Sequence, residues 1–558
     1  MRGLYPRALS ALLLLCQSQI ALGKRVVVDW DVGYVNVNRD NTVMRRAIGV
    51  NGALPIPPVF VTKGDTLILN VANSLDKSTS VHAHGLFQKG TSYLDGPAMV
   101  TQCGIPPGHS FTYEYAIDQP GTYWLHGHDN HENSDGFRTP FVVYDRHSPF
   151  DYDEDILLSF EDWYKEEFAE RAKITLDPAF SFPPPHGFGH GLINGINGNY
   201  TEPIYFHPGK TYRLRLVNMG TLRWFQFTLP GHHMRVIEMD GIDIEPQVVE
   251  GLDMAPGQRF SVLVTAHDSV EFNYRYNATM YASFVPATTG LEPRTYFGDI
   301  IYREGAPFKR HSGGSSQTWF ADDVALHSLD REPALPVDRS IRLMLGNNPY
   351  STGQHLDHIS NITYSPPKVP SLYTALTMGE LAMTPEVYGP QIHAVVLKHM
   401  EVVELTIHNP NDMPHPLHLH GHAFQVIEYG LSESTFPIPD KFKNTPTRRF
   451  TGAPAKRDTM SIPMFQYIKV RFRADNPGVW FLHCHLDIHF IMGMAMTFVE
   501  APDVLQKTQT VPPQMLEHCK AQGIHTWGNA AGNDGYNFGG LPDPPRIVPR
   551  PQGGRNPA

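Results

Sequence analysis

Residues 476–489 read NPGVWFLHCHLDIH, a turn and an apolar run that end in closely spaced metal-ligating side chains. An apolar run bounded by an Asn-Pro-Gly turn is typical of a buried β-strand. Since side chains i and i+2 of a strand share a face, His483 and His485 would point one way and Cys484 the other. The stretch therefore predicts a strand that serves two metal sites placed back to back.

Three other segments repeat the His-x-His spacing. They contain the pairs His82 and His84, His126 and His128, and His418 and His420. Each pair can present two imidazoles to one site, so the four pairs supply eight. A single pair is ordinary on a strand surface, but four pairs in one chain indicate a large His-ligated metal site.

The second site would form around Cys484. His415 is an odd number of residues before His418 and can face the Cys484 side, while His489 lies past the strand end and Met494 ten residues after Cys484. Two His and one Cys with a weak axial Met form the ligand set of a blue-copper centre. A soft thiolate selects copper over magnesium or calcium, although ligand types alone leave zinc open.

Outside these motifs the chain predicts short strands. Gly (47) and Pro (48) are abundant, which favours turns over long helices. The strongest helical signals cover residues 161–173 and 513–523. β-Branched and aromatic runs bounded by turn residues predict strands at 26–32, 66–71, 111–115, 212–217, 260–265, 402–407 and 467–472.

Two pairs of segments suggest duplicated domains. Residues 118–126 (DQPGTYWLH) parallel 474–483 (ADNPGVWFLH), and 107–111 (PGHSF) parallel 256–260 (PGQRF). At roughly 150 residues per domain, the length of 558 predicts three or four domains. We expect an all-β chain of β-sandwiches whose parts are a signal peptide (1–23), three domains (24–148, 149–310 and 341–501), a linker (311–340) and a C-terminal tail (502–558).

The N-terminus predicts export. Arg2 and Arg7 precede an apolar run and a small-residue cleavage site, and no later segment carries 18 apolar residues in a row. We therefore expect a secreted protein without a membrane span. Exported chains can carry N-glycans, and the sequons are at Asn199, Asn277 and Asn361. The net charge of −11 argues against a nucleic-acid partner.

Cysteine usage separates this chain from disulfide-dense and Cys-rich metal proteins. It has 29 His and only 4 Cys. Cys16 would leave with the signal peptide, so Cys103, Cys484 and Cys519 remain. Three is an odd number, so either one thiol is free or one sulfur has another role.

The four His segments resemble the copper-binding motifs of the multicopper oxidases, which include laccases, ascorbate oxidases and fungal ferroxidases. The resemblance covers nearly the whole mature chain. It implies three cupredoxin-like Greek-key β-sandwiches and four copper ions, with a trinuclear cluster between the first and third domains. By the same resemblance, Cys103 can form a disulfide with Cys519.

The resemblance also implies which residues bind each copper. His82 and His418 would bind type 2 copper, and His415, Cys484, His489 and axial Met494 would bind type 1 copper. The type 3 pair would be bound by His84, His126, His128, His420, His483 and His485.

The implied reaction moves electrons from a donor at His489 through Cys484 to the cluster, where four electrons reduce O₂ to water. Asp95 and Asp487 match acidic positions that supply protons in relatives. An axial Met should give a modest type 1 potential. We therefore expect a monomeric, laccase-like oxidase of phenols, such as precursors of a pigment or another secondary metabolite, with O₂ and a small aromatic molecule as its partners.

The ligand motifs are also compatible with other activities. A ferroxidase is the main alternative, followed by an ascorbate oxidase and a non-enzymatic copper carrier. Residues 218–222 contain no acid where many laccases bind phenols with a carboxylate, so the resemblance does not indicate how a phenol would bind here. Asp162 before Trp163 favours a laccase slightly, because iron-uptake ferroxidases tend to have Glu there.

Overall fold

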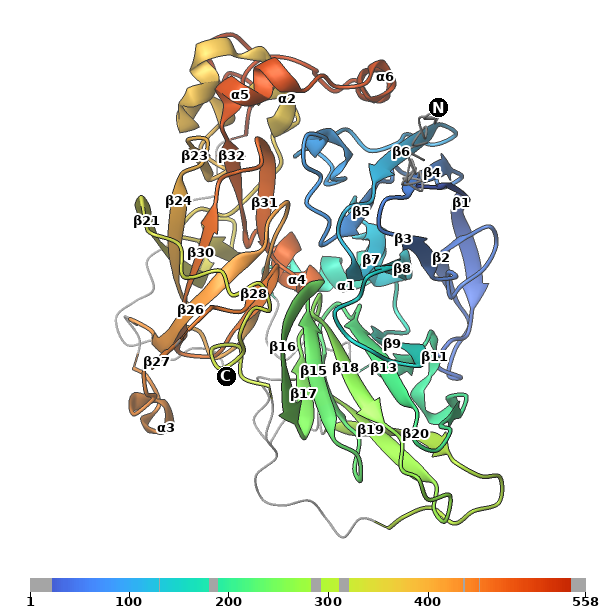
Figure 1. Cartoon of the computed structure of the whole chain (residues 1–558). Helices are drawn as coiled ribbons and strands as arrows, with labels where there is room; N and C mark the ends of the chain where they lie inside the picture. The colour runs from blue at the N-terminus through green and yellow to red at the C-terminus, as the bar shows by residue number, and fades with distance from the viewer. Residues whose placement is uncertain are drawn as a thin grey trace, which may run out of the picture.

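The computed structural model describes residues 23–542, except 130, 180–188, 283–292, 311–320, 435–436 and 451. The predicted signal peptide (1–23) therefore lies outside the described residues apart from Gly23, as do part of the predicted linker and the end of the predicted tail. Strands dominate the described chain and form three pairs of sheets, which confirms the all-β prediction. Figure 1 shows the first pair in blue, the second in green and the third in orange.

The first sandwich consists of two four-stranded sheets. Its apolar residues alternate along β6, whose burial pattern places every second side chain inside. One sheet runs β2 (Arg45–Val50), β1 (Arg25–Val37), β4 (Thr66–Asn73), β6 (Ser110–Ala116). The other runs β3 (Val59–Thr62), β8 (Arg138–Tyr144), β7 (Gly121–Gly127), β5 (Val81–His84).

The second sandwich pairs a seven-stranded sheet with a five-stranded one. The larger sheet runs β11 (Ile196–Asn197), β10 (His190–Ile193), β9 (Glu154–Trp163), β13 (Thr211–Asn218), β18 (Arg259–Thr265), β15 (Met234–Met239), β16 (Ile242–Val249). The smaller runs β12 (Ile204–Tyr205), β20 (Arg294–Ile301), β19 (Tyr274–Tyr281), β14 (Trp224–Thr228), β17 (Gly251–Met254).

The third sandwich has the same plan. One sheet runs β22 (His355–Ile359), β21 (Arg339–Pro349), β24 (Val402–His408), β30 (Gln466–Arg473), β26 (Phe424–Leu431), β27 (Arg448–Arg449), with β28 (Lys456–Arg457) beside β26. The other runs β23 (Ala394–Leu397), β32 (Ala495–Glu500), β31 (Gly478–Cys484), β25 (His415–Leu419), β29 (Thr459–Ile462). All seven strands predicted from the sequence are present.

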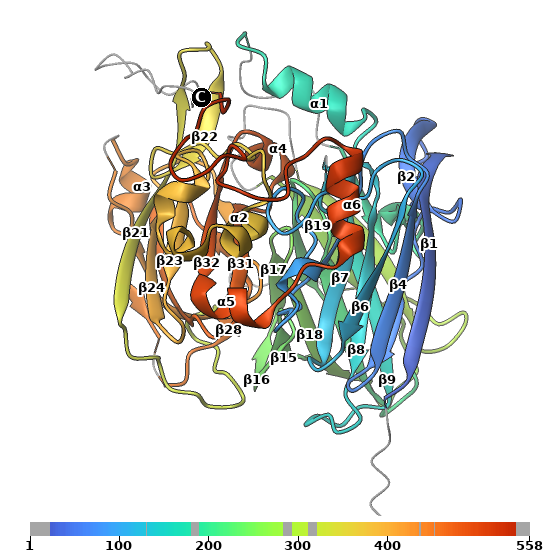
Figure 2. The same ribbon diagram turned by 90° about the horizontal axis from the view of Figure 1, so that it is seen from above.

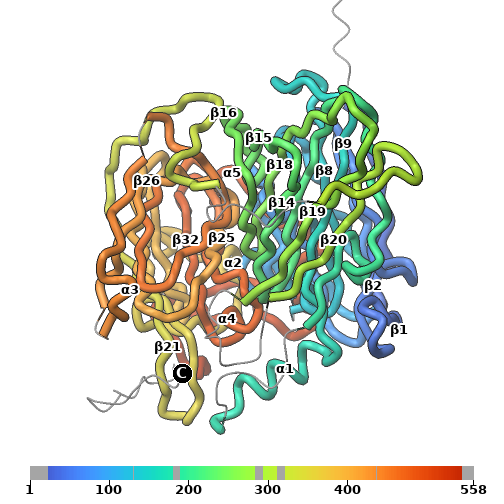
Figure 3. The backbone as a smooth tube through the Cα atoms, turned by 90° about the horizontal axis from the view of Figure 1, so that it is seen from below, coloured from blue at the N-terminus to red at the C-terminus, as the bar shows by residue number. Residues whose placement is uncertain are grey.

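The helices are short and lie around the sheets. They are α1 (Phe168–Thr175), α2 (Ser371–Thr377), α3 (Asp440–Lys443), α4 (Asp487–Ile491), α5 (Pro502–Thr508) and α6 (Pro513–Ala521). Figure 3 shows α1 of the second sandwich beside α4 of the third, and residues of the two helices are in contact.

One predicted helix was partly wrong. Residues 161–163 belong to β9 rather than to a helix over 161–173, and α1 begins at Phe168. Glu161 pairs with Leu192 of β10 in the sheet, and its buried carboxylate accepts hydrogen bonds from Arg39 and Arg138. These tertiary contacts outweigh the helical preference of the local sequence.

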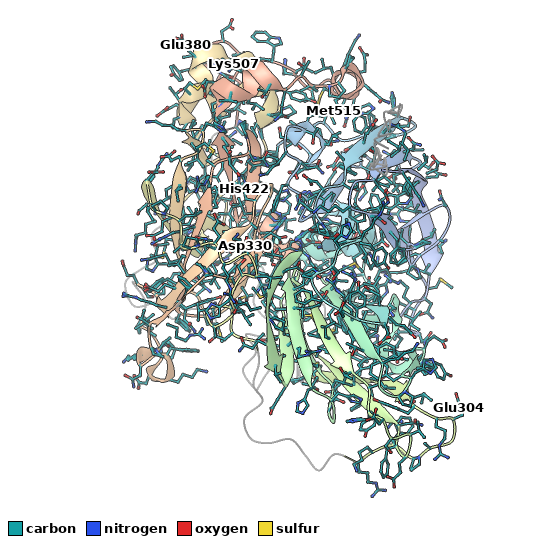
Figure 4. The ribbon with its side chains drawn as sticks, viewed as in Figure 1. Glu304, Asp330, Glu380, His422, Lys507 and Met515 are labelled. Atoms are coloured by element: carbon teal, nitrogen blue, oxygen red, sulfur yellow. A yellow bond between two sulfur atoms is a disulfide. The ribbon has the colours of Figure 1, made fainter. Side chains whose placement is uncertain are left out.

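The apolar core of the first sandwich extends to one side of the third, which also has a core of its own. Phe481 of β31 packs in the same cluster as the first sandwich, together with Met515 and Cys519 of α6. Figure 2 shows α6 beside β6, and Gln514 of α6 donates to the carbonyl of Ser110 in that strand. Figure 4 labels Met515 where the C-terminal segment reaches the first sandwich. This packing brings the His-bearing ends of β7 and β31 to the junction of the two sandwiches.

Candidate metal centres

One candidate centre, here the thiolate centre, lies within the third sandwich and consists of His415, Cys484 and His489. The Nδ1 atoms of the two His are 3.0 Å apart, and Cys484 Sγ lies 3.7 Å from His415 Nδ1 and 3.6 Å from His489 Nδ1. β25 carries His415, β31 carries Cys484 and α4 carries His489. Three ligand atoms so close together can bind a single metal ion.

Met494 lies beside this centre. It is fully buried, and its carbonyl accepts a hydrogen bond from the Cys484 backbone N–H at 3.0 Å. The structure thus places the backbone of Met494 beside that of Cys484, and the role of Met494 as an axial ligand stays a prediction.

Burial sets the protonation of the thiolate centre. It lowers the pKa of His489 to about 4 and raises the pKa of the Cys484 thiol well above its usual value. The imidazole is thus neutral and ready to bind a metal, whereas metal binding must displace the thiol proton.

The second candidate centre, here the His cluster, contains the eight imidazoles of the four His-x-His pairs. β5 and β7 of the first sandwich pair His82 with His126, and β25 and β31 of the third pair His418 with His483. Across the junction the rings of His84 and His418 stack with centroids 3.7 Å apart. His420 Nε2 lies 3.1 Å from His483 Nε2.

The structure therefore brings the predicted ligands together in two groups on opposite sides of β31. Cys484 faces away from its neighbour His483, as the strand alternation predicts. Within the His cluster, possible ligand atoms converge in three triads: His82, His84 and His418; His84, His126 and His485; and His128, His420 and His483.

The inner nitrogens of the cluster have the properties that a metal requires. His82, His126 and His483 donate through Nδ1 to the carbonyls of Asp95, Gly127 and Cys484 at 2.7, 3.0 and 3.0 Å. These bonds leave each Nε2 as a lone-pair donor. Buried cluster nitrogens without a hydrogen-bond partner are His82 Nε2, His84 Nδ1, His126 Nε2, His418 Nε2 and both nitrogens of His485. Unpaired buried nitrogens are costly, so metal ions in their midst explain the arrangement.

Burial favours the neutral form of several imidazoles of the cluster. Burial, and then the charge of neighbouring imidazoles, lowers the pKa of His485 to about 3 and that of His126 and His420 well below the usual value. Neutral imidazole is the form that binds metal.

The two predicted acids differ in position. Asp95 lies on the outer side of the cluster, where its carboxylate accepts from His420 Nδ1 at 2.9 Å. Asp487 begins α4 and accepts from Ser134 Oγ at 2.5 Å, and burial raises its pKa to about 7. Asp487 also lines a cavity of about 310 Å³ together with His126, His128, His483 and His485.

Sequence reasoning missed Asp458. Its Oδ1 lies 3.3 Å from His84 Nε2 and 3.4 Å from His418 Nδ1. Although burial opposes ionisation, the Arg259 guanidinium and hydrogen bonds from these two His hold the pKa of Asp458 well below its usual range. Asp458 follows His418 by 40 residues in the sequence, and no spacing rule connects the two.

The remaining predicted sites are placed as follows. Cys103 and Cys519 form a disulfide, and Cys484 is a free, buried thiol. Asn199 and Asn361 are exposed, while Asn277 is half-buried in β19, and glycosylation of all three stays a prediction. Within the part of the chain that the structure describes, no helix is long and apolar enough to span a membrane.

Comparison with known proteins agrees with this geometry. Multicopper oxidase family profiles match residues 31–148, 154–294 and 364–504. "Iron transport multicopper oxidase fetC" of Epichloe festucae is 37% identical over 95% of this chain and 85% of its own. "Iron multicopper oxidase fer1" of Mycosarcoma maydis is 36% identical over 98% and 91%.

Solved structures give the same picture. "Fet3p, a Multicopper Oxidase that Functions in Iron Import" superposes with a TM-score of 0.82 at 31% identity, covering 91% of this chain and 97% of that one. A laccase from Botrytis aclada superposes with a TM-score of 0.72 at 24% identity, covering 90% and 92%. The latter likeness shows the shared cupredoxin-like fold alone.

These findings correct the expected substrate. The expectation of a laccase-like phenol oxidase with an aromatic reductant was wrong, because near-full-length relatives at 36–37% identity are named for iron. The axial Met and short loop segments suggested a phenol, but loop segments carry little signal that transfers from one relative to another.

Matching profiles over most of the chain and relatives above 30% identity together establish the family. This chain belongs to the multicopper oxidases, copper-dependent oxidoreductases that use O₂ and contain one type 1 copper, one type 2 copper and a type 3 pair.

Proposed function

We propose that this protein is a ferroxidase, which oxidises Fe²⁺ one electron at a time and delivers four electrons to each O₂. The observation that carries the proposal is the similarity to iron-transport oxidases along 95–98% of the chain. A net charge of −11 is consistent with it, since an acidic surface attracts a cation and repels an anionic donor such as ascorbate.

The local structure where laccases carry a phenol-binding acid also supports this choice. Residues 218–222 contain no carboxylate, and the nearby Asp162 is already engaged. Its Oδ1 accepts from the Thr221 backbone N–H at 2.7 Å and its Oδ2 from that of Leu222 at 2.8 Å. Asp162 therefore shapes the loop. The residue is only 1% exposed, and its oxygens already accept from groups of this chain, including the Tyr164 hydroxyl.

We further assign the ligands to the two centres. His415, Cys484, His489 and Met494 would hold type 1 copper, and the His cluster would hold type 2 copper through His82 and His418 and the type 3 pair through the other six His. Bound copper would supply the one-electron acceptor at the thiolate centre and the site of O₂ reduction at the His cluster. The orphaned inner nitrogens of the cluster fit this assignment.

The chain itself supplies the connection between the centres. Cys484 is joined by peptide bonds to His483 and His485, so a covalent path of one residue links the two. His489 is 5% exposed, against 3% for His415 and 0% for Cys484 and Met494, which makes it the candidate for electron entry. Electrons can therefore pass from the thiolate centre to the His cluster without any movement of the protein.

Acidic side chains would supply the protons that O₂ reduction consumes. With a pKa raised by burial to about 7, Asp487 can hold a proton near neutral pH on the oxygen that does not accept from Ser134. It lines the same cavity as four cluster His, so water there can exchange protons with it. Asp95 keeps the rings of His82 and His420 in place through hydrogen bonds at 2.7 and 2.9 Å.

Oxygen uptake by the copper-loaded protein tests the proposal. Donors to compare are Fe²⁺, a diphenol, a dihydroxynaphthalene and ascorbate, at mildly acidic pH where Fe²⁺ oxidises slowly by itself. We expect the highest kcat/KM with Fe²⁺ and four Fe²⁺ consumed per O₂. The Cys484→Ser variant is the matched control for uncatalysed oxidation.

Two outcomes would refute the assignment. Faster uptake with the diphenol or the dihydroxynaphthalene than with Fe²⁺ would reject the ferroxidase, and no uptake with any donor would favour a copper carrier.

A further inference from the structure

The second sandwich supplies none of the assigned copper ligands, yet one of its loops touches the His cluster. This loop, residues 255–259, contains the PGQR segment whose parallel at 107–110 reads PGHS. Gly257 has φ of +87°, and a Cβ there would lie 3.0 Å from His485 Cδ2 and 3.2 Å from His84 Cε1. The equivalent Gly108 has open space around it. The two motifs therefore differ in role.

Arg259, at the end of this loop, contacts all three sandwiches. Its Nη1 and Nη2 donate to Asp458 Oδ1 and Oδ2 at 2.8 and 2.7 Å, and its Nε donates to the Thr122 carbonyl at 3.0 Å. Its own backbone N–H donates to Asp240 at 2.8 Å. The guanidinium and the Asp458 carboxylate are both buried, with 0% and 2% exposure.

The Asp458 carboxylate, which Arg259 holds, lies beside the outer nitrogens of His84 and His418. Besides Asp458, the adjacent Thr459 hydroxyl lies 3.1 Å from both His84 Nε2 and His418 Nδ1. Gln258 secures this segment, because its side chain donates to the Thr459 carbonyl at 3.1 Å. These contacts fix the outer nitrogens, so the partnerless His84 Nδ1 and His418 Nε2 face the cluster.

We propose that Arg259 is a positioning residue for the trinuclear copper site: it holds Asp458 and Thr459 of the third sandwich against His84 and His418. Hydrogen-bond partners of metal-binding His fix ring orientation, and losing them typically weakens metal retention about 10- to 100-fold. Removing one partner of a buried ion pair also leaves the other charge unpaired, which disturbs the local structure strongly.

The alternative is that Arg259 merely ties sandwiches together. Arg39 provides a matched control, because it joins the first and second sandwiches by a bidentate pair with Glu161 at 2.9 and 3.1 Å. It also donates from Nε to a backbone carbonyl, that of Gly195, and its side chain is 3% exposed. Within the described residues, its hydrogen bonds reach Glu161 and Gly195 and no cluster His.

The test compares Arg259→Met and Arg259→Lys with Arg39→Met in the full-length, copper-loaded protein. Readouts are copper retained against a chelator, the type 2 electron paramagnetic resonance signal and the blue absorption of type 1 copper. Arg259→Met should lose at least half of the type 2 signal and retain its blue absorption, while Arg39→Met keeps both. Arg259→Lys should be intermediate, since lysine keeps the charge without the bidentate geometry.

Equal copper loss in the Arg259→Met and Arg39→Met proteins would overturn the proposal, as would an unchanged type 2 signal in Arg259→Met. If Arg259→Met does not fold, Thr459→Val removes the shared hydroxyl with little change of volume. It should alter the type 2 signal with the blue absorption intact, and an unaltered type 2 signal would equally reject the proposal.

Discussion

The two copper centres use the same strand but are assembled differently. All three close ligand atoms of the thiolate centre come from one sandwich, on β25, β31 and α4. The His cluster is completed only where the first sandwich meets the third, and its outer contacts extend to Arg259 of the second.

The two centres therefore depend on different parts of the folding process. The thiolate centre needs the third sandwich to fold, whereas the His cluster also needs the sandwiches to dock correctly. Changes at sandwich junctions should therefore affect type 2 and type 3 copper first. Variants that should damage one centre and spare the other test whether the two centres are independent.

The largest effect is expected from Cys484→Ser. Serine cannot supply the thiolate, so the blue absorption should vanish and Fe²⁺ oxidation should fall at least about 1,000-fold. The eight cluster His are untouched, so three coppers per chain should remain. Visible spectra, copper analysis and O₂ uptake measure these changes, and a protein that stays blue would show the type 1 assignment to be wrong.

The double variant Cys103→Ser/Cys519→Ser should come next. The disulfide links residues 416 positions apart and secures α6 to the first sandwich. Its loss should reduce the free energy of unfolding by up to about 5 kcal/mol, because the unfolded chain gains freedom.

The two centres should then respond differently to heat. The type 2 signal should disappear at a lower temperature than the blue absorption, as the first sandwich separates from the third. Simultaneous loss of both signals would contradict the independence of the thiolate centre. A calorimetric scan under oxidising and reducing conditions provides the control.

Asp95→Asn should have a more moderate effect. The backbone carbonyl that binds His82 remains, but the charge beside His420 is lost. We expect O₂ reduction to slow about 10- to 100-fold with unchanged reduction of type 1 copper by Fe²⁺. Stopped-flow spectroscopy separates the two steps. Asp475→Asn, which removes an exposed ion pair with Lys89, is the control and should affect neither.

The same comparison explains how far the sequence could predict the site. The thiolate and His ligands were readable because each group lies in a short strand or at its end, where a spacing of two residues fixes the shared face. Asp458 and Arg259 were not. Asp458 meets His418 through the pairing of strands 40 residues apart and meets His84 only where sandwiches dock, and Arg259 reaches Asp458 from another sandwich. Strand runs were predictable for the same local reason, while β9 overrode the helical signal at Glu161 through buried ion pairs.

The smallest effect is expected from a change of Asp357, a buried carboxyl near the thiolate centre. Its N–H donates to Met492 at the end of α4, and its Oδ1 accepts from Asn347 at 2.7 Å. Its Oδ2 is buried and accepts no hydrogen bond among the described residues, whereas both carboxylate oxygens of Asp458 accept from Arg259. Burial accordingly raises the pKa of Asp357 to about 7.

This shift makes a prediction with a definite sign. Between the ordinary pKa of 3.8 and about 7, the folded protein binds more protons at Asp357 than the unfolded chain, so its stability falls as the pH rises. Asp357→Asn removes this loss, and should raise the stability of the third sandwich at pH 8 while leaving it unchanged near pH 4. Because the new amide also lacks a partner, the gain should be only about 1 kcal/mol. Thermal midpoints at both pH values, followed through the blue absorption, measure it. A variant that is less stable at pH 8 would mean that the carboxylate is needed by the thiolate centre, which would then depend on more than its own ligands.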